Sequence, residues 1–95
     1  MSLEFEWNAK KAEAKRIRHG VDFEEALTVF RDPLALIFED EEHSKDEPRE
    51  IIIGHSVKGR LLLACFTIRA TRVRIISARR ATSLERKDYE ENLPQ

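Results

Sequence analysis

The chain contains little of the sulfur and glycine on which many small proteins rely. Its 95 residues include one cysteine, Cys65, and three glycines. A single cysteine excludes an internal disulfide and a cysteine-rich zinc site. The glycines form no phosphate-binding loop, and there is no serine-histidine-aspartate set or nucleotide motif, so we expect no cofactor. Cys65 lies within the apolar run of residues 61–66, which favours a buried core thiol.

Long apolar runs are also missing. No stretch approaches the roughly 20 apolar residues that cross a bilayer, and residues 1–4 lack the apolar region of a signal peptide. We therefore expect a cytoplasmic protein with no membrane partner. Because 41% of the residues are hydrophobic and 37% are charged, the chain should fold, and its length suits a single domain over residues 1–95.

The net charge of −1 hides a strong separation of charge along the chain. Residues 39–50 carry seven acidic side chains and only two basic ones. Residues 60–80 show the reverse, with six arginines and no acidic residue, and a second basic block occupies residues 10–18. Separation of this kind suggests a basic face for a polyanion, although a solvated surface of mixed charge is the alternative.

The N-terminal residues predict a short extended segment and a helix. Phe5 and Trp7 alternate with glutamates, which suits a strand or an anchored extended segment. Asn8 can cap the helix that the alanine-, lysine- and arginine-rich residues 9–19 favour. Gly20 then supplies the left-handed conformation in which such a helix ends.

A second helix and a short strand are predicted next. Asp22 and Glu25 have the spacing of a capping box, and the residues between them and Asp32-Pro33 carry one apolar helical stripe. The proline stops this helix. Residues 34–38 then form a short apolar strand, and the acidic residues 39–48 form an exposed loop.

The C-terminal half predicts three more strands and a last helix. Residues 49–55, 61–69 and 72–78 are rich in strand-forming residues, and their connections are short enough for hairpins. Thr82 and Glu85 form a capping box for a helix over residues 84–91, whose thin apolar stripe suggests light docking or cover by a partner. The expected fold class is α+β, with two N-terminal helices, a four-stranded mainly antiparallel sheet and a C-terminal helix. The core candidates are Phe23, Leu27, Phe30, Leu36, Phe38, Ile51, Ile53, Leu62, Phe66, Val73 and Ile75.

Several short motifs occur in an order that is shared with one bacterial family. In the N-terminal half they are Phe5-x-Trp7-Asn8, Lys11, Arg18-His19-Gly20-Val21-x-Phe23-Glu24-Glu25-Ala26 and Val29-Phe30-x-Asp32-Pro33. In the C-terminal half they are Ile53-Gly54, Phe66-Thr67-Ile68-Arg69, Arg74-Ile75-Ile76-Ser77-Ala78-Arg79-Arg80-Ala81, Glu85-Arg86 and Tyr89-Glu90. With these motifs the chain resembles the BrnT toxins of type II toxin-antitoxin systems.

The resemblance implies a fold similar to that of the RelE ribonuclease toxins and cleavage of RNA that arrests translation. It also implies a neighbouring antitoxin with a ribbon-helix-helix DNA-binding domain. DNA would then be contacted only indirectly, through the antitoxin.

Cleavage of RNA without a metal uses the ribose 2′-hydroxyl as nucleophile, and negative charge gathers on the phosphate oxygens. Guanidinium groups suit this task because they are permanently charged and present a planar fork of donors. Arg69, Arg74 and the pair Arg79-Arg80 lie on two hairpin-paired strands and can converge, although arginines can also simply protect a sheet edge. The resemblance adds weight to Arg69, Arg79 and Arg80 as catalytic residues.

Arginine is a poor general base because its pKa exceeds about 12. The resemblance places functional residues on the last helix, so Tyr89 and Glu90 are the candidates for proton transfer. The alternative is that Tyr89 packs the helix on the sheet and Glu90 is solvated. The residues expected to bind RNA phosphates, with no reading of sequence, are Lys11, Lys15, Arg18 and Arg74.

The three histidines do not predict a metal site. His43 and His55 have no histidine or cysteine partner at metal-ligand spacing. His19 is better explained by a favourable charge at a helix C-terminus than by catalysis.

The sequence thus predicts a metal-independent endoribonuclease with RNA as substrate and an antitoxin as partner. A non-catalytic RNA-binding module with the same basic face is one alternative, although Phe66 and Tyr89 are too few aromatics for a base-stacking platform. An interaction subunit whose basic face holds an acidic partner is the other.

Overall fold

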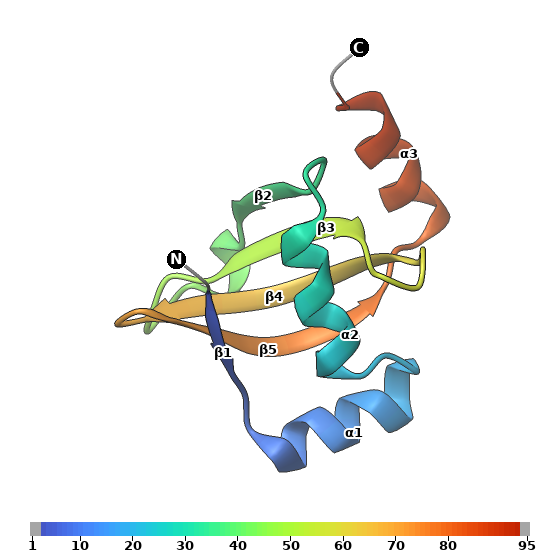
Figure 1. Ribbon diagram of the computed structural model, residues 1–95. Helices are drawn as coiled ribbons and strands as arrows, with labels where there is room; N and C mark the ends of the chain where they lie inside the picture. Colours follow the sequence, from blue (N-terminus) through green and yellow to red (C-terminus); the bar gives the residue numbers. More distant parts are fainter. Residues whose placement is uncertain (1–2, 94–95) are drawn as a thin grey trace.

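The apolar segments of the chain build a five-stranded sheet with the order β1-β5-β4-β3-β2. The computed structural model describes residues 3–93 (Figure 1). Strands β2 (Leu36–Glu39), β3 (Glu50–His55), β4 (Leu61–Arg69) and β5 (Arg72–Arg80) form an antiparallel meander. Strand β1 (Glu4–Glu6) pairs in parallel with β5. The α+β class is confirmed, but the sheet has five strands instead of four because the extended segment at Phe5 joins it.

The helices begin and end where the capping residues predict. Helix α1 spans Ala9–His19, and the Asn8 side chain accepts a hydrogen bond from the Lys11 amide at 3.0 Å. Gly20 ends α1 with φ +72°, the left-handed conformation that favours glycine. Helix α2 (Phe23–Thr28) continues as the 3₁₀ turn η1 (Val29–Arg31), and a second such turn, η2, spans Glu41–His43. Helix α3 spans Ser83–Glu91, and Thr82 and Glu85 form the predicted capping box.

Helix α2 packs on one face of the sheet, which we call the helix-covered face, while α1 runs beside β5 (Figure 1). The main core lies here and comprises Val21, Phe23, Ala26, Val29, Ile52, Leu62, Ala64, Phe66, Val73, Ile75 and Ala78. Most of the predicted core residues are buried or half-buried, but Phe38 on the outermost strand is 49% exposed. Its prediction as a core residue is therefore wrong.

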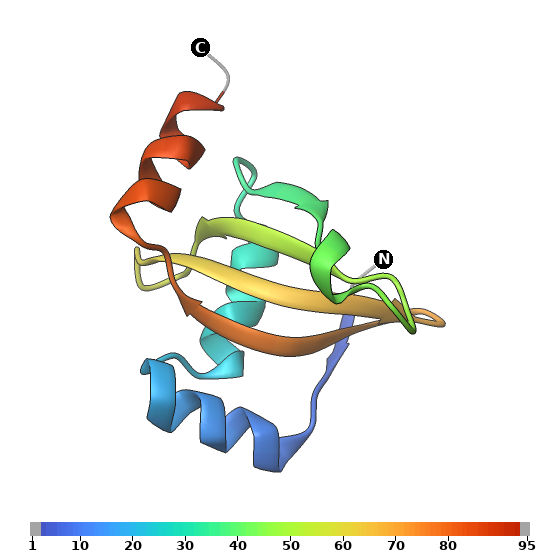
Figure 2. The same ribbon diagram turned by 180° about the vertical axis from the view of Figure 1, so that it is seen from behind.

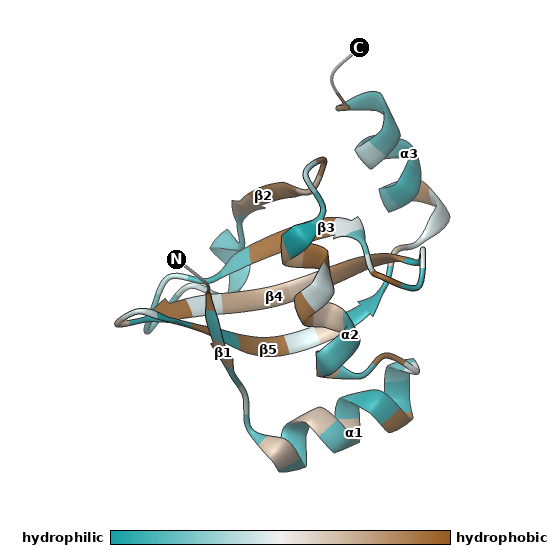
Figure 3. Ribbon diagram, viewed as in Figure 1, coloured by the Kyte–Doolittle hydropathy of each residue, from teal (hydrophilic) through white to brown (hydrophobic). Residues whose placement is uncertain are grey.

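The opposite, open face of the sheet is only partly covered (Figure 2). A smaller cluster of Ile53, Leu61, Leu63 and Tyr89 holds α3 over one end of this face. Apart from the exposed Leu84, most of the rest of α3 is hydrophilic (Figure 3), which agrees with the thin apolar stripe expected from the sequence. In the described part of the chain, no helix is both long and apolar enough to cross a membrane.

A β-bulge in β5 decides which side chains reach the open face. Phe66 of β4 pairs with Ile75, but Cys65 pairs with Ser77, so Ile76 is an extra residue. Because side chains alternate between the faces of a strand, one extra residue exchanges the faces for everything after it. Arg79 therefore lies opposite Leu63 on the open face, and Arg80 lies opposite Leu62 on the helix-covered face.

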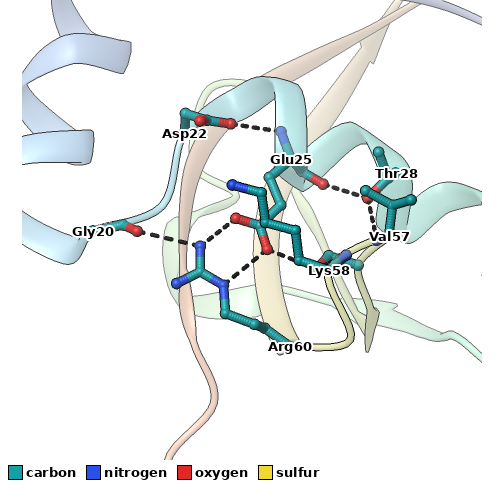
Figure 4. A network of polar contacts seen from close by, with 8 residues as sticks. Gly20, Asp22, Glu25, Thr28, Val57, Lys58 and Arg60 are labelled. Atoms are coloured by element: carbon teal, nitrogen blue, oxygen red, sulfur yellow. Dashed lines mark hydrogen bonds and ion pairs between the residues drawn. The ribbon is translucent and has the colours of Figure 1, made fainter.

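A buried carboxylate joins α2 to the hairpin between β3 and β4 (Figure 4). The Glu25 side chain is 2% exposed, forms an ion pair with Arg60, and accepts a hydrogen bond from the Ser56 hydroxyl at 2.6 Å. The guanidinium of Arg60 and the hydroxyl of Ser56 hold the pKa of Glu25 below its usual value, against the opposing effect of burial. The network spans 35 residues of sequence and fixes the helix relative to the sheet.

Candidate active site

The open face carries a hollow of about 300 Å³ between α1, strands β3–β5 and residues 40–49. Its polar and sulfur-bearing lining residues are Lys15, Asp40, His43, Arg49, Cys65 and Arg79. Three of these side chains, those of Lys15, Arg49 and Arg79, are basic. They come from three separate parts of the chain, so the hollow exists only in the folded protein.

Arg79 is held in a fixed orientation at one wall of the hollow. Its Nη1 and Nη2 atoms donate to the two carboxylate oxygens of Glu85 at 2.7 and 2.8 Å. Glu85 also accepts from the Thr82 amide at 2.9 Å, as the capping box of α3 requires. The fork-to-fork pair with Arg79 lowers the pKa of Glu85 to about 2. The start of α3 thus fixes the guanidinium before any ligand arrives.

Asp40 and His43 form a second polar pair at the hollow. The Asp40 side chain is 10% exposed, and its carboxylate oxygens lie 3.0 and 3.1 Å from Nδ1 of His43, whose side chain is 58% exposed. If Nδ1 donates to the carboxylate, Nε2 of the neutral ring is left as a proton acceptor. Ser44 supports this arrangement, since its hydroxyl donates to the Asp40 carbonyl at 2.6 Å and accepts from the Arg49 amide at 2.9 Å.

Arg49 has an unsatisfied donor inside the protein. Its Nε is buried and has no hydrogen-bond partner among the described residues. A buried donor of this kind is rare in native proteins because it costs free energy comparable to a lost hydrogen bond.

Cys65 lies half-buried in the hollow, so the predicted core thiol is only partly enclosed. Its Sγ donates to a carboxylate oxygen of Asp40 at 3.6 Å. Burial, followed by the negative charge of Asp40, raises the pKa of the thiol to about 11. The sulfur is therefore protonated at neutral pH and is not a nucleophile there.

The prediction that Arg69, Arg74, Arg79 and Arg80 converge on one site is wrong, because they lie at different ends and on different faces of the β4–β5 hairpin. Arg69 pairs with Arg72 at one end of the β4–β5 hairpin, and Arg80 pairs with Leu62 at the other. The nine residues from Arg72 to Arg80 span roughly 26 Å at the usual rise of a strand. The bulge also places Arg79 and Arg80 on opposite faces. Of the predicted catalytic arginines, only Arg79 lines the hollow.

Arg69 and Arg74 lie on the open face but are paired with carboxylates. Arg69 donates to Glu47 at 2.8 and 3.2 Å, and Arg74 donates to Glu6 at 3.1 Å. Arg69 lines a separate, wider depression next to the acidic loop, which meets the hollow at His43 and Arg49.

Tyr89 packs α3 on the sheet, which is the alternative that the sequence left open. The residue is 3% exposed, its ring lies against His55 at 5.7 Å between centroids, and its hydroxyl donates to the Leu34 carbonyl at 3.4 Å. Burial raises the pKa of Tyr89. Glu90 is exposed on α3. Neither residue lines the hollow.

The predicted phosphate-binding residues of α1 share one stripe of the helix. Lys11, Lys15 and Arg18 are separated by four and three residues, which places them along one side. Lys15 is the member that reaches the hollow. His19 follows Arg18, and burial and then the charges of Arg18 and Lys15 lower its pKa. The surroundings of His19 therefore disfavour the positive charge that we expected it to carry at the end of the helix.

Asp40, His43 and Arg49 were not predicted as site residues, because the composition of the acidic residues 39–48 predicts an exposed loop. One signal was present: Arg49 precedes Ile51 by two residues, and strand alternation puts both on one face. No comparable pattern marks Asp40 and His43. Among residues 3–93, no cluster of three or more histidine, cysteine, aspartate or glutamate residues is arranged to hold a metal ion.

Comparison with known proteins agrees with this architecture. A crystal structure of the Brucella abortus ribonuclease toxin BrnT superposes with a TM-score of 0.68 and 20% sequence identity, covering 86% of this chain and 100% of that one. A search of curated proteins gives no match. Residues 7–85 match the family model for the ribonuclease toxin, BrnT, of type II toxin-antitoxin systems. Because the match covers most of the chain, the protein belongs to the BrnT family of ribonuclease toxins.

Proposed function

We propose that this toxin is an endoribonuclease that cleaves RNA in the hollow of the open face without a metal ion. The observation that carries the proposal is the convergence of Lys15, Arg49 and Arg79 on one hollow that also contains the Asp40-His43 pair. Three cations can hold a phosphate, and one of them, Arg49, has a buried Nε without a hydrogen-bond partner among the described residues. The family supplies the substrate class, since its members are ribonuclease toxins.

In the proposed reaction the ribose 2′-hydroxyl attacks the adjacent phosphorus. His43 accepts the hydroxyl proton at Nε2, and Asp40 stabilises the imidazolium that forms. Arg49 and Arg79 stabilise the charge on the non-bridging oxygens, and Lys15 adds a third cation. The bond to the 5′-oxygen breaks, that oxygen takes a proton from solvent, and the products carry a 2′,3′-cyclic phosphate and a 5′-hydroxyl.

The remaining predicted residues keep supporting roles in this proposal. Lys11 and Arg18 extend the cationic stripe of α1 away from Lys15 and can hold neighbouring phosphates. Arg69 and Arg74 lie on the same face and can add phosphate contacts if RNA displaces their carboxylate partners. The catalytic roles that the sequence predicted for Arg80, Tyr89 and Glu90 are not part of this proposal, because none of the three residues lines the hollow. Arg80 lies on the opposite face of the sheet from Arg79, which makes it a suitable comparison.

The test is cleavage of a defined RNA by the purified chain in EDTA, with the product ends mapped. We expect 2′,3′-cyclic phosphate and 5′-hydroxyl ends. Strict dependence on magnesium with 5′-phosphate products would contradict the mechanism.

Single substitutions then locate the site. Removing one preorganised donor typically lowers turnover a hundred- to thousandfold, so Arg79→Ala should lower it at least tenfold, and His43→Ala should act similarly. Arg80→Ala is the matched control, because it removes the same charge from the opposite face and should leave turnover unchanged. If the Arg79, Arg80 and Lys15 variants all kept the turnover of the unmodified chain at saturating RNA, a binding module would be favoured over an enzyme.

The family also implies a cognate antitoxin. We propose a ribbon-helix-helix antitoxin that covers the hollow and α3, so that the cytoplasmic complex is inactive and contacts DNA only through the antitoxin. A fold relationship to the RelE toxins belongs to the same proposal. If RNA cleavage persisted with the antitoxin fully bound, masking of the hollow would be wrong.

A further inference from the structure

A second depression, a groove of about 340 Å³, lies between α3 and β2, one of the two edge strands of the sheet. Its apolar lining includes Leu36, Phe38 and Tyr89, and its polar lining includes Asp88 of α3 and Asn92, the residue after α3. Along the same edge, Leu34, Ile37 and Phe38 are 49%, 54% and 49% exposed. Phe38 lies on the open face beside Ile51, whereas Ile37 lies on the helix-covered face beside Ile52. Exposed apolar side chains on both faces of an edge strand favour cover by a partner.

The backbone of β2 is open to a further strand. The Asp40 amide donates to the Arg49 carbonyl at 2.9 Å across the β2–β3 ladder. In an antiparallel pair, hydrogen-bonded positions alternate along each strand, so Leu36 and Phe38 also bond to β3. The N–H and C=O groups of Ile37 and Glu39 consequently point away from the sheet, where an added strand can pair with them.

The acidic side chains along β2 indicate what kind of segment can bind at this edge. Residues 36–42 contain four acidic side chains and no lysine or arginine, and Asp88 adds a carboxylate at the groove. A second copy of the chain would bring the same acidic segment to the edge without a cation to offset it. An extended segment with lysine or arginine would complement the edge.

We propose that an extended segment of the cognate antitoxin, in which basic residues alternate with bulky apolar ones, adds to β2 as a sixth strand. Main-chain hydrogen bonds to Ile37 and Glu39 hold the segment, and one apolar side chain fills the groove beside Phe38. The inference rests on the proposed function only for the identity of the partner.

Docking at this edge places the antitoxin next to the active site. Leu63 lines both the groove and the hollow, and Glu85 lines the groove while its carboxylate holds Arg79. A segment anchored on β2 therefore brings the rest of the antitoxin within reach of the hollow. It also contacts the helix that orients Arg79.

The test compares two substitutions at Ile37 in binding to the purified antitoxin. Ile37→Pro removes an N–H that points away from β3, so β2–β3 pairing is kept while strand addition is blocked. Ile37→Thr is the matched control, since it keeps the N–H and the β-branched shape. We expect the dissociation constant to rise at least tenfold for Ile37→Pro and less than threefold for Ile37→Thr. Both variants should cleave RNA like the unmodified chain.

Hydrogen exchange of the unmodified protein gives an independent readout that does not depend on the proline variant folding. The amide protons of Ile37 and Glu39 should exchange at least tenfold more slowly in the antitoxin complex than in the free chain. Equal exchange in both states, or equal binding by both Ile37 variants, would overturn the proposal.

Two further outcomes are distinguishable. Protection of these amides in the isolated chain, together with a dimeric mass, would identify a second copy as the occupant and overturn the assignment to the antitoxin. Failure of the unmodified chain to cleave RNA would contradict the proposed function. Loss of antitoxin binding in Ile37→Pro would still support strand addition in that case.

Discussion

Replacing Glu85 with glutamine tests whether the start of α3 fixes the arginine of the hollow. Glutamine has the same size and is accepted at this position of a capping box, so the helix cap is kept and the charge of the pair with Arg79 is removed. The pKa of Glu85 lies at about 2 instead of 4.5, which corresponds to at most about 3 kcal/mol of stabilisation. Since the Arg79 side chain is 41% exposed and that of Glu85 28%, screening by solvent reduces this to about 1–2 kcal/mol.

The pH dependence identifies the charge as the cause. A carboxyl whose pKa is lowered in the folded state stabilises the protein above the pKa of the unfolded state and loses that effect as the pH falls. For Glu85 the window runs from about pH 4.5 down to about 2. Urea unfolding followed by circular dichroism should give Glu85→Gln a lower unfolding free energy at pH 7, and the difference should shrink between pH 4.5 and 3. If the difference in unfolding free energy between the variant and the unmodified chain stayed constant down to pH 3, the charge of Glu85 would not be its cause.

The same variant should lower RNA turnover because Arg79 loses its preorganised orientation. We expect a decrease of about three- to tenfold at saturating RNA, smaller than that of Arg79→Ala, with little change in the Michaelis constant. Glu91→Gln is the matched control, since it removes a charge from the exposed last residue of α3. If both variants changed turnover equally, net charge and not orientation would be the cause.

Three other substitutions or measurements test the packing. Glu25→Gln should lower the free energy of unfolding by about 3 kcal/mol, because it leaves the Arg60 guanidinium without its buried, negatively charged partner. This loss of stability, measured by urea unfolding, should shrink as the pH falls below 4.5. Cys65, with a pKa of about 11, should react with iodoacetamide at pH 8 at least tenfold more slowly than the urea-unfolded chain does, and equal rates would contradict its burial. Gly54→Ala should cost about 1–3 kcal/mol, since a Cβ there would lie 2.9 Å from the Cβ of Ala35, and an unchanged melting temperature would show that the contact relaxes.

The local structure was predictable because it depends on neighbouring residues. Asn8, Gly20 and the Thr82-Glu85 box mark helix ends through hydrogen bonds that span three or four residues. The strands predicted at 61–69 and 72–78 follow from runs of strand-forming residues joined by a short turn, and the structure extends the second of them to Arg80. These signals fixed the element types and most of their bounds, apart from the parallel strand β1, whose partner lies 68 residues away.

The site was less predictable because it depends on contacts between distant residues. One extra residue at Ile76 exchanges Arg79 and Arg80 between the faces of the sheet, and nothing in the composition of β5 marks a bulge. The acidic segment supplies Asp40 and His43 because it folds back over the sheet and hydrogen-bonds to Arg49. Nothing in the charged residues of this segment predicts that it will contact the sheet.

The charge separation along the chain is largely cancelled in space, and this sets the expected salt dependence of RNA binding. Four arginines, Arg69, Arg72, Arg74 and Arg79, are each paired with a carboxylate from another element.

The salt dependence of RNA binding shows how many cations bind phosphate, because each contact to a single strand contributes about −0.7 to the slope of log K against log salt concentration. If RNA engages mainly the three cations of the hollow, the slope should be about −2. If the whole basic face of α1, β4 and β5 bound the backbone, about eight contacts would give a slope near −6. Fluorescence anisotropy of a labelled RNA on the His43→Ala variant, measured over a salt series, distinguishes the two. A slope steeper than about −5 would show that the paired arginines release their carboxylates on binding, and the hollow would then be only part of the RNA interface.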